Sequence, residues 1–250
     1  MKICIAQTRA VKGDIEANLV NHKKVIEHSA SQGAKMIIFP ELSLTGYEPE
    51  LANALAMNKD DEQLNELQQA SDEKNIMIGA GIPVRSGKDV LIGMIIFRPL
   101  QPRQTYFKQY LHPDEEPWFV KGLSQQILEG FNDHIALAIC YEISVPDHAR
   151  QAHESGAKIY IASVAKTVEG MERAFGTLAA TAKKYSMVVL VSNCVGECEG
   201  KEAGGRSAIW NDKGMLLEQL NDKDEGIIIF DTNTMETIKE QKVDFLLREL

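Results

Sequence analysis

Three reactive side chains stand at the ends of apolar segments that look like buried strands. Glu41 comes shortly after one such segment, and Lys108 and Cys140 directly follow two others. Catalytic sites of α/β sheets gather at strand ends. A cysteine that acts as a nucleophile needs a base or a cation beside it, because a thiol with an ordinary pKa of about 8.5 is only a few per cent thiolate at pH 7. Glu41 and Lys108 offer one of each.

Each of these residues, taken alone, has a simpler interpretation. A glutamate after a strand is usually a helix cap or a surface charge, and a lone lysine is usually solvated. A cysteine that ends an apolar strand is usually a small buried residue. Three such residues, each at the end of a separate strand, favour a catalytic cysteine over these structural roles.

The elements that must position the three residues alternate between helix-like and strand-like patterns. Amphipathic helices are predicted over 16–33, 60–74, 147–155 and 169–185. Strands are predicted over 3–7, 35–39, 76–80, 90–97, 104–107, 135–139, 158–162, 187–191, 206–210, 215–219 and 226–230. The strand over 76–80 is expected to stop at Gly81-Ile82-Pro83. The alternation of helices and strands, with hairpins between some strands, predicts a layered α/β domain with a mixed sheet or sheets.

The amino-acid composition limits the classes of protein to which this chain can belong. The chain has 250 residues, of which 44% are apolar and 25% charged, enough to bury a full core in one large domain. The formal charge of −9 and the lack of a basic run disfavour a nucleic-acid partner. Every apolar run is far shorter than the roughly 20 residues that cross a bilayer, so no membrane association is expected. The chain opens directly in a strand pattern without a signal region, which predicts a cytoplasmic location.

The four cysteines lack the dense, regular spacing of a secreted disulfide scaffold, so a reducing compartment fits. Cys194 and Cys198 form a C-x-x-x-C pair that raises the alternative of a structural zinc or redox protein. The usual metal-binding spacings have two intervening residues and a second ligand pair. We therefore predict no metal site, and the role of this cysteine pair stays open.

Three segments together resemble the nitrilase, or carbon-nitrogen hydrolase, superfamily. Residues 39–47, Phe-Pro-Glu-Leu-Ser-Leu-Thr-Gly-Tyr, are similar to its first signature, 106–111 to its lysine segment, and 137–142 with Pro146-Asp147 to its cysteine segment. They occur in family order, with 67 residues from Glu41 to Lys108 and 32 from Lys108 to Cys140. The resemblance covers roughly residues 1–231.

The resemblance implies that Cys140 is the nucleophile, Glu41 the general base and Lys108 the electrostatic stabiliser of a tetrahedral oxyanion. It also implies that Glu115, seven residues before a glycine, is a positioning partner of Lys108. The alternative for Glu115 is an ordinary surface residue of the acidic run 114–116, with Glu116 as the adjacent competitor.

Further residues are predicted to form the oxyanion site and the substrate pocket: Tyr141 through its backbone N–H, Tyr47, Glu142, Lys166 and Asn193. The sequence departs from the family at two places. Ser144 stands where many amidases have an arginine that pairs with a substrate carboxylate, which makes an acidic substrate bound in that way less favoured. Lys166 lies in the segment where the family carries a tryptophan, and it either faces the pocket as a cation or occupies a solvated loop.

The resemblance also implies a four-layer α-β-β-α sandwich with two mixed sheets, a homodimer, and no cofactor or metal. We divide the chain into a hydrolase domain over 1–231 and a charged tail over 232–250. The tail is expected either to pack at the dimer interface or to form a surface helix on its own domain.

The predicted function is hydrolysis of a small linear amide to a carboxylic acid and ammonia through a cysteine thioester. A nitrilase, an N-carbamoyl amide hydrolase or an acyl transferase on the same trio is the alternative within the class. A non-catalytic scaffold of the same fold is the alternative outside it.

Overall fold

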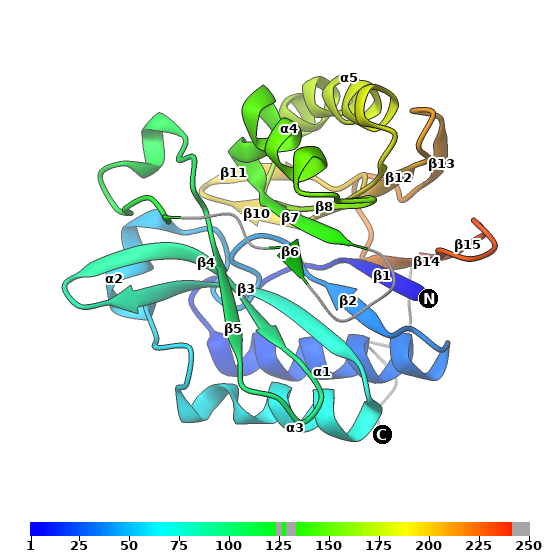
Figure 1. Ribbon diagram of the computed structural model, residues 1–250. Coiled ribbons are helices and arrows are strands. Elements are labelled where there is room, and N and C mark those ends of the chain that lie inside the picture. Colours follow the sequence, from blue (N-terminus) through cyan, green and yellow to red (C-terminus); the bar gives the residue numbers. More distant parts are fainter. Residues whose placement is uncertain (124–126, 129–133, 242–250) are drawn as a thin grey trace.

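The computed structural model describes residues 1–123, 127–128 and 134–241, and it consists of two mixed sheets packed face to face between helices (Figure 1). The first sheet has the order β15-β14-β1-β2-β3-β4-β5 and the second the order β13-β12-β9-β8-β7-β6. The strands of the first sheet are β1 (Lys2–Gln7), β2 (Met36–Ile38), β3 (Met77–Ser86), β4 (Asp89–Phe97), β5 (Gln104–Phe107), β14 (Gly226–Asp231) and β15 (Thr237–Gln241). Those of the second are β6 (Ile127–Leu128), β7 (Ile135–Ile139), β8 (Ile159–Val164), β9 (Val188–Asn193), β12 (Ala208–Trp210) and β13 (Leu216–Gln219).

Helices cover the outer faces of both sheets, which completes the predicted four layers. Helices α1 (Ile15–Ser31) and α3 (Asn65–Lys74) lie against the first sheet, and α4 (Pro146–Glu154) and α5 (Val168–Tyr185) lie against the second (Figure 1). The remaining helical segments are α2 (Ala52–Leu55) and the 3₁₀ turns η1 (Pro49–Leu51), η2 (Glu62–Leu64), η3 (Pro113–Glu115) and η4 (Cys140–Ser144). The predicted α-β-β-α architecture is confirmed.

The central strands are buried on both faces because each one contributes side chains to two cores. In β1, Ile3 and Ile5 belong to the apolar layer between the two sheets, whereas Cys4 and Ala6 belong to the layer beneath α1 and α3. A third core lies between the second sheet and α4 and α5. Alternate side chains of a strand point to opposite faces of the sheet, which is why these strands read as continuous apolar runs rather than alternating ones.

The parallel strands of both sheets end at the same place. Strands β1, β2 and β3 are mutually parallel in the first sheet, as are β7, β8 and β9 in the second. Ser163 at the end of β8 donates a hydrogen bond of 2.8 Å to the carbonyl of Phe39, directly after β2. The carboxyl ends of the two parallel sets are therefore joined where the predicted reactive residues stand.

The expected stop of β3 at Gly81-Ile82-Pro83 is wrong. The strand continues to Ser86, with Pro83 paired opposite Ile92 of β4. Its other neighbour, β2, pairs only with residues 77–79, so Pro83 lies at an edge of β3 that carries only an isolated bridge, in which the Met57 N–H donates to the Pro83 carbonyl at 3.1 Å. A proline is tolerated at such an edge because no neighbouring strand needs its missing N–H.

Two hairpin segments were not predicted. Strands β10 (Val195–Cys198) and β11 (Lys201–Gly204) form a separate two-stranded sheet with Glu199-Gly200 at its turn. The tail begins with β15, an antiparallel neighbour of β14, and not with a surface helix. Residues 242–250, the rest of the predicted tail, lie outside the described residues.

Among the helices of the described ranges, none is both long enough and apolar enough to span a membrane.

His22 ties α1 to the segment that carries Glu41. Its Nε2 accepts a hydrogen bond of 2.9 Å from the Ser43 hydroxyl, its Nδ1 donates one of 2.7 Å to the carbonyl of Asn18, and its ring stacks on Phe39. Burial lowers the pKa of His22 to about 4, because a charged imidazole would lose its hydration there. The folded protein therefore keeps this ring neutral under conditions in which the unfolded chain binds a proton.

We predict that His22 makes the protein less stable as the pH falls from 7 to 5. Its pKa is lower in the folded state than the ordinary value of 6.5, so its stabilising contribution is present above that value and is lost as the pH falls toward 4. The expected loss by pH 5 is about 2 kcal/mol from this residue. Denaturant unfolding of wild type and His22→Gln at both pH values measures it. Equal pH dependence in the two proteins would contradict the assignment.

Candidate active site

Glu41 lies in a buried turn after β2, and one of its carboxylate oxygens is free. Oε1 accepts a hydrogen bond of 2.7 Å from the Lys108 ammonium. Oε2 is buried and accepts no hydrogen bond from the described residues. Burial raises the pKa of Glu41, while Lys108 and the Cys140 thiol act to lower it. A carboxylate with a raised pKa and an unused oxygen is equipped to take and return a proton.

The turn that carries Glu41 needs a glycine on the neighbouring strand. A Cβ on Gly81 of β3 would lie 2.3 Å from the Leu42 nitrogen and 2.9 Å from the Pro40 carbonyl oxygen. Leu42 itself has a φ of 50°, an uncommon conformation for a residue with a side chain. The Leu44 N–H donates to the Gly81 carbonyl at 3.0 Å, which fixes the turn against the strand.

Lys108 is completely buried and holds two carboxylates. Its ammonium donates at 2.7 Å to Glu41 and at 2.6 Å to Glu115 Oε1, and its side chain is 0% exposed. The solvated lysine of the alternative interpretation is thus excluded. Burial alone would lower the pKa of Lys108, but the neighbouring anions, Glu41 first, raise it above its ordinary value. Lys108 is therefore a positively charged residue in the protein interior.

Glu115 belongs to this cluster and not to the surface. It is 1% exposed, its Oε1 also accepts a hydrogen bond of 2.8 Å from the Tyr47 hydroxyl, and its Oε2 accepts one of 2.8 Å from the His112 N–H. Its neighbour Glu116 is exposed. Both oxygens of Glu115 are therefore used to hold Lys108, Tyr47 and the loop at His112. Tyr47, predicted for the pocket, has its hydroxyl committed to this carboxylate.

Cys140 lies at a strained corner between β7 and η4. Its φ is +42°, a conformation that only a few per cent of non-glycine residues adopt. Its Sγ lies 4.0 Å from the carbonyl oxygen of Ala165, directly after β8. Burial and then the Glu41 carboxylate raise the pKa of Cys140 to about 11, although Lys166 and Lys108 act against them. The resting thiol is therefore protonated, and it needs a base at the moment of attack.

Glu142 lies behind Cys140 and not in the pocket, which corrects its predicted place. It is 0% exposed; Oε1 accepts from the Gln109 N–H at 2.6 Å, and Oε2 accepts from the Ile139 N–H and the Tyr106 hydroxyl, each at 2.7 Å. Burial raises the pKa of Glu142 to about 7 despite these donors. The Glu142 carboxylate thus links Gln109, which follows Lys108, to Ile139, which precedes Cys140. Both of its oxygens are used in this way, so none is left for a substrate.

Asn193 also differs from its predicted role. Its amide is fully buried and is used by the backbone: Oδ1 accepts from the Lys166 N–H at 2.9 Å, and Nδ2 donates to the carbonyls of Lys166 and Gly205. It clamps the loop after β8.

Tyr141 and Lys166 are both partly exposed beside Cys140, and the ring of Tyr141 meets His112 edge to face.

Cys194 and Cys198 lie near this centre. Both have free thiols; Cys198 is buried, and its pKa is raised first by the neighbouring Cys194 and then by burial, with smaller effects from Glu41 and Cys140. In the described part of the chain, no group of three or more His, Cys, Asp or Glu residues is arranged to hold a metal ion.

Comparison with known proteins identifies the family of this chain. The profile described as "Carbon-nitrogen hydrolase" matches residues 2–240. The chain belongs to the carbon-nitrogen hydrolase family. It superimposes on a cysteine variant of the Nesterenkonia AN1 amidase from the nitrilase superfamily with a TM-score of 0.84 and 22% identity, covering 92% of this chain and 90% of that one. At that identity the superposition shows the fold.

Curated relatives of this carbon-nitrogen hydrolase carry several names. The 2-oxoglutaramate amidase of Bacillus subtilis is 26% identical, over 79% of this chain and 78% of its own length. The nitrilase of Pyrococcus abyssi is 22% identical, over 91% and 87%. The glutamine-dependent NAD(+) synthetase of Aquifex aeolicus is 24% identical over the whole chain, which spans only 45% of that protein.

Some residues that build the site escaped sequence reasoning. His22, Tyr106 and His148 support the Glu41 and Cys140 turns from within the core, where a polar residue in an apolar pattern is the only sequence signal. His148 contacts Tyr106 at 2.9 Å and Tyr160 at 2.7 Å. The sequence pattern predicts that Gly81 ends a strand, whereas in the structure it lets the Glu41 turn pack closely against β3.

We predict that Gly81→Ala lowers kcat/KM about 100-fold, because the added methyl group displaces the Glu41 turn and a shift of about 1 Å costs that much in catalysis. The loss of stability should be about 1–3 kcal/mol. Ammonia release from a small amide and denaturant unfolding measure the two effects. Gly87→Ala is the control: its φ of +59° imposes strain, but its Cβ meets no atom within 4 Å, so activity should persist. Equal activity in the two variants would contradict the prediction.

Proposed function

We propose that this carbon-nitrogen hydrolase cleaves a small linear amide to a carboxylic acid and ammonia through a thioester on Cys140. The proposal rests mainly on one observation: a fully buried ammonium, Lys108, held between two carboxylates at the end of the strand next to a strained cysteine. A buried ion trio is costly to desolvate, so its presence where strands of both sheets meet is better explained by chemistry than by stability.

The first half of the reaction forms the thioester. Glu41 removes the Cys140 proton through its free Oε2 while the sulfur attacks the amide carbon. The carbonyl π electrons move onto oxygen, and the Lys108 ammonium and the Tyr141 N–H stabilise that oxyanion. Losing one such donor typically costs about 100- to 1,000-fold in rate. Glu41 then returns the proton to the amide nitrogen, the C–N bond breaks, and ammonia leaves.

The second half hydrolyses the thioester. Glu41, again a carboxylate, removes a proton from water as its oxygen attacks the thioester carbon. The carbon–sulfur bond breaks, the acid is released, and the proton passes from Glu41 to the sulfur. Glu115 takes no part in these proton transfers in our scheme. It holds the Lys108 ammonium in place and thereby keeps the positive charge next to the developing oxyanion.

We predict that brief exposure to small amides gives an acyl adduct in the intact protein that requires Cys140. Wild type should gain the mass of the acyl group, and Cys140→Ser should gain none and lose more than about 1,000-fold of turnover, because serine is far less ionised beside the same base. Intact-mass analysis and ammonia release measure these outcomes. Near-normal turnover by Cys140→Ser would remove Cys140 from the role of nucleophile, and an inert wild type would favour the scaffold alternative. Turnover of nitriles or N-carbamoyl compounds instead, shown by product analysis, would support the other chemistries of this trio.

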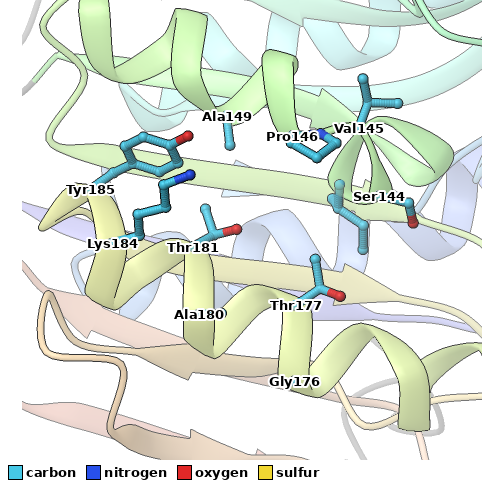
Figure 2. Close-up of a pocket in the computed structure, with 11 residues that line it drawn as sticks. Ser144, Val145, Pro146, Ala149, Gly176, Thr177, Ala180, Thr181, Lys184 and Tyr185 are labelled. Atoms are coloured by element: carbon cyan, nitrogen blue, oxygen red, sulfur yellow. The ribbon is translucent and has the colours of Figure 1, made fainter.

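We also propose that the protein is a homodimer that pairs through α4 and α5. A groove of about 380 Å³ opens between these helices on the outer face of the second sheet (Figure 2). Its α5 side presents Gly176, Thr177, Ala180 and Thr181, small side chains that would let a second copy approach closely. In a two-fold dimer the same groove on each copy meets the other, which would join two sandwiches across their helix layers.

We predict that Ala180→Arg leaves a monomer, because the long cation would occupy the groove and be buried without a partner. Sedimentation velocity should give twice the chain mass of 27.8 kDa for wild type and the single mass for the variant. Gln69→Arg, on the exposed side of α3, adds the same charge elsewhere and should stay dimeric. A monomeric wild type, or a dimeric Ala180→Arg, would contradict this interface.

A further inference from the structure

Lys166 follows β8 at the side of the nucleophile, and its backbone is held rigidly. Its N–H donates to Asn193 Oδ1 at 2.9 Å, and its carbonyl accepts from Asn193 Nδ2 at 3.1 Å and from the Gly204 N–H at 2.7 Å. The preceding residue, Ala165, has the carbonyl oxygen that faces the Cys140 sulfur. The peptide group just before Lys166 therefore contacts the nucleophile.

The side chain of Lys166 has no counter-ion. It is partly buried, and the described residues place no carboxylate within 4.0 Å of its ammonium. Its stem packs on the first turn of α5, where a Cβ at Gly170 would lie 3.4 Å from Lys166 Cβ. Within the described part of the chain, the charge of Lys166 is thus unpaired.

The Lys166 ammonium also acts electrostatically on the nucleophile. Among the groups that lower the pKa of the Cys140 thiol, Lys166 has a larger effect than Lys108. That pKa still stays at about 11, so the charge of Lys166 does not by itself produce a thiolate. Lys108 already donates to two carboxylates and in the proposed reaction faces the oxyanion, whereas Lys166 remains available to a charge that arrives with the substrate.

We propose that Lys166 is a specificity residue that binds an anionic group at the far end of the substrate, so that the preferred substrates are short amides ending in a carboxylate. This inference rests on the amide hydrolysis proposed above and narrows its substrate class. The position that would otherwise supply such a cation, Ser144, is exposed and lines the groove on the outer helix face. Lys166 supplies the cation instead, from the loop after β8, the strand next to β7.

The decisive comparison is between the monoamide of succinic acid and butyramide, which have the same length and differ only in the terminal carboxylate. Wild type should have the higher kcat/KM for the acid. Lys166→Met, which keeps the stem and removes the charge, should lower the ratio of the two kcat/KM values about 10- to 100-fold, as expected for loss of a charge-assisted hydrogen bond. The change should lie mainly in KM for the acid. Lys166→Arg should restore most of the ratio, and Lys88→Met, at the tip of the β3–β4 hairpin, should keep it.

A binding measurement separates this inference from the proposed reaction. Succinate should slow the alkylation of Cys140 by iodoacetamide, followed by intact mass, in wild type, Lys166→Arg and Lys88→Met but not in Lys166→Met. This protection needs no turnover, so it would persist even if amide hydrolysis failed. A wild type that prefers butyramide, a ratio that Lys166→Met leaves unchanged, or succinate protection that is absent or independent of Lys166 would each overturn the proposal.

Discussion

The buried ammonium of Lys108 between two carboxylates is the interaction on which the rest of the site depends. Three charged groups without solvent are tolerated only if each is held by hydrogen bonds in good geometry. Glu115 is therefore held by Tyr47 and the loop at His112, and Glu41 by a turn that fits closely over Gly81. The turns around the site are shaped to position these charges, and this explains the strain at Leu42 and Cys140.

The two-sheet architecture supplies what this charge cluster requires. Glu41 and Lys108 come from the first sheet, while Cys140 and the loop of Lys166 come from the second. Direct bonds join the sheets at this point: Ser163 to the Phe39 carbonyl, and the Glu41 N–H to the Val164 carbonyl at 3.4 Å. Glu41 and Cys140 stand on separate sheets, so they keep their relative positions only if the sheets cannot slide, and the shared apolar layer with these bonds prevents that.

Polar residues behind the site form a second supporting system. Glu142 connects the residue after Lys108 with the residue before Cys140, and Tyr106, His148 and Tyr160 continue the network into the second sheet. Such a network is stabilising only when every member is satisfied, because unpaired polar groups in a low-dielectric interior are costly. Its burial explains why Glu142, predicted beside the substrate, instead holds the backbone on either side of the site, and Asn193, buried separately, holds the loop after β8.

The sequence alone determined the order of the elements and the layered α/β class, and it singled out Glu41, Lys108 and Cys140. Periodicity shows which residues are buried, and the segments around Glu41, Lys108 and Cys140 are local in the chain, so both can be read without a structure. Only the tertiary structure decided that Glu115 is internal, that Gly81 continues a strand under the Glu41 turn, and that Asn193 and Glu142 face backbone donors. These outcomes depend on contacts between residues far apart in the chain, such as Glu41 and Lys108, which are 67 positions apart. A hydrophobic pattern predicts which residues are buried, but not which buried polar atoms form hydrogen bonds with each other.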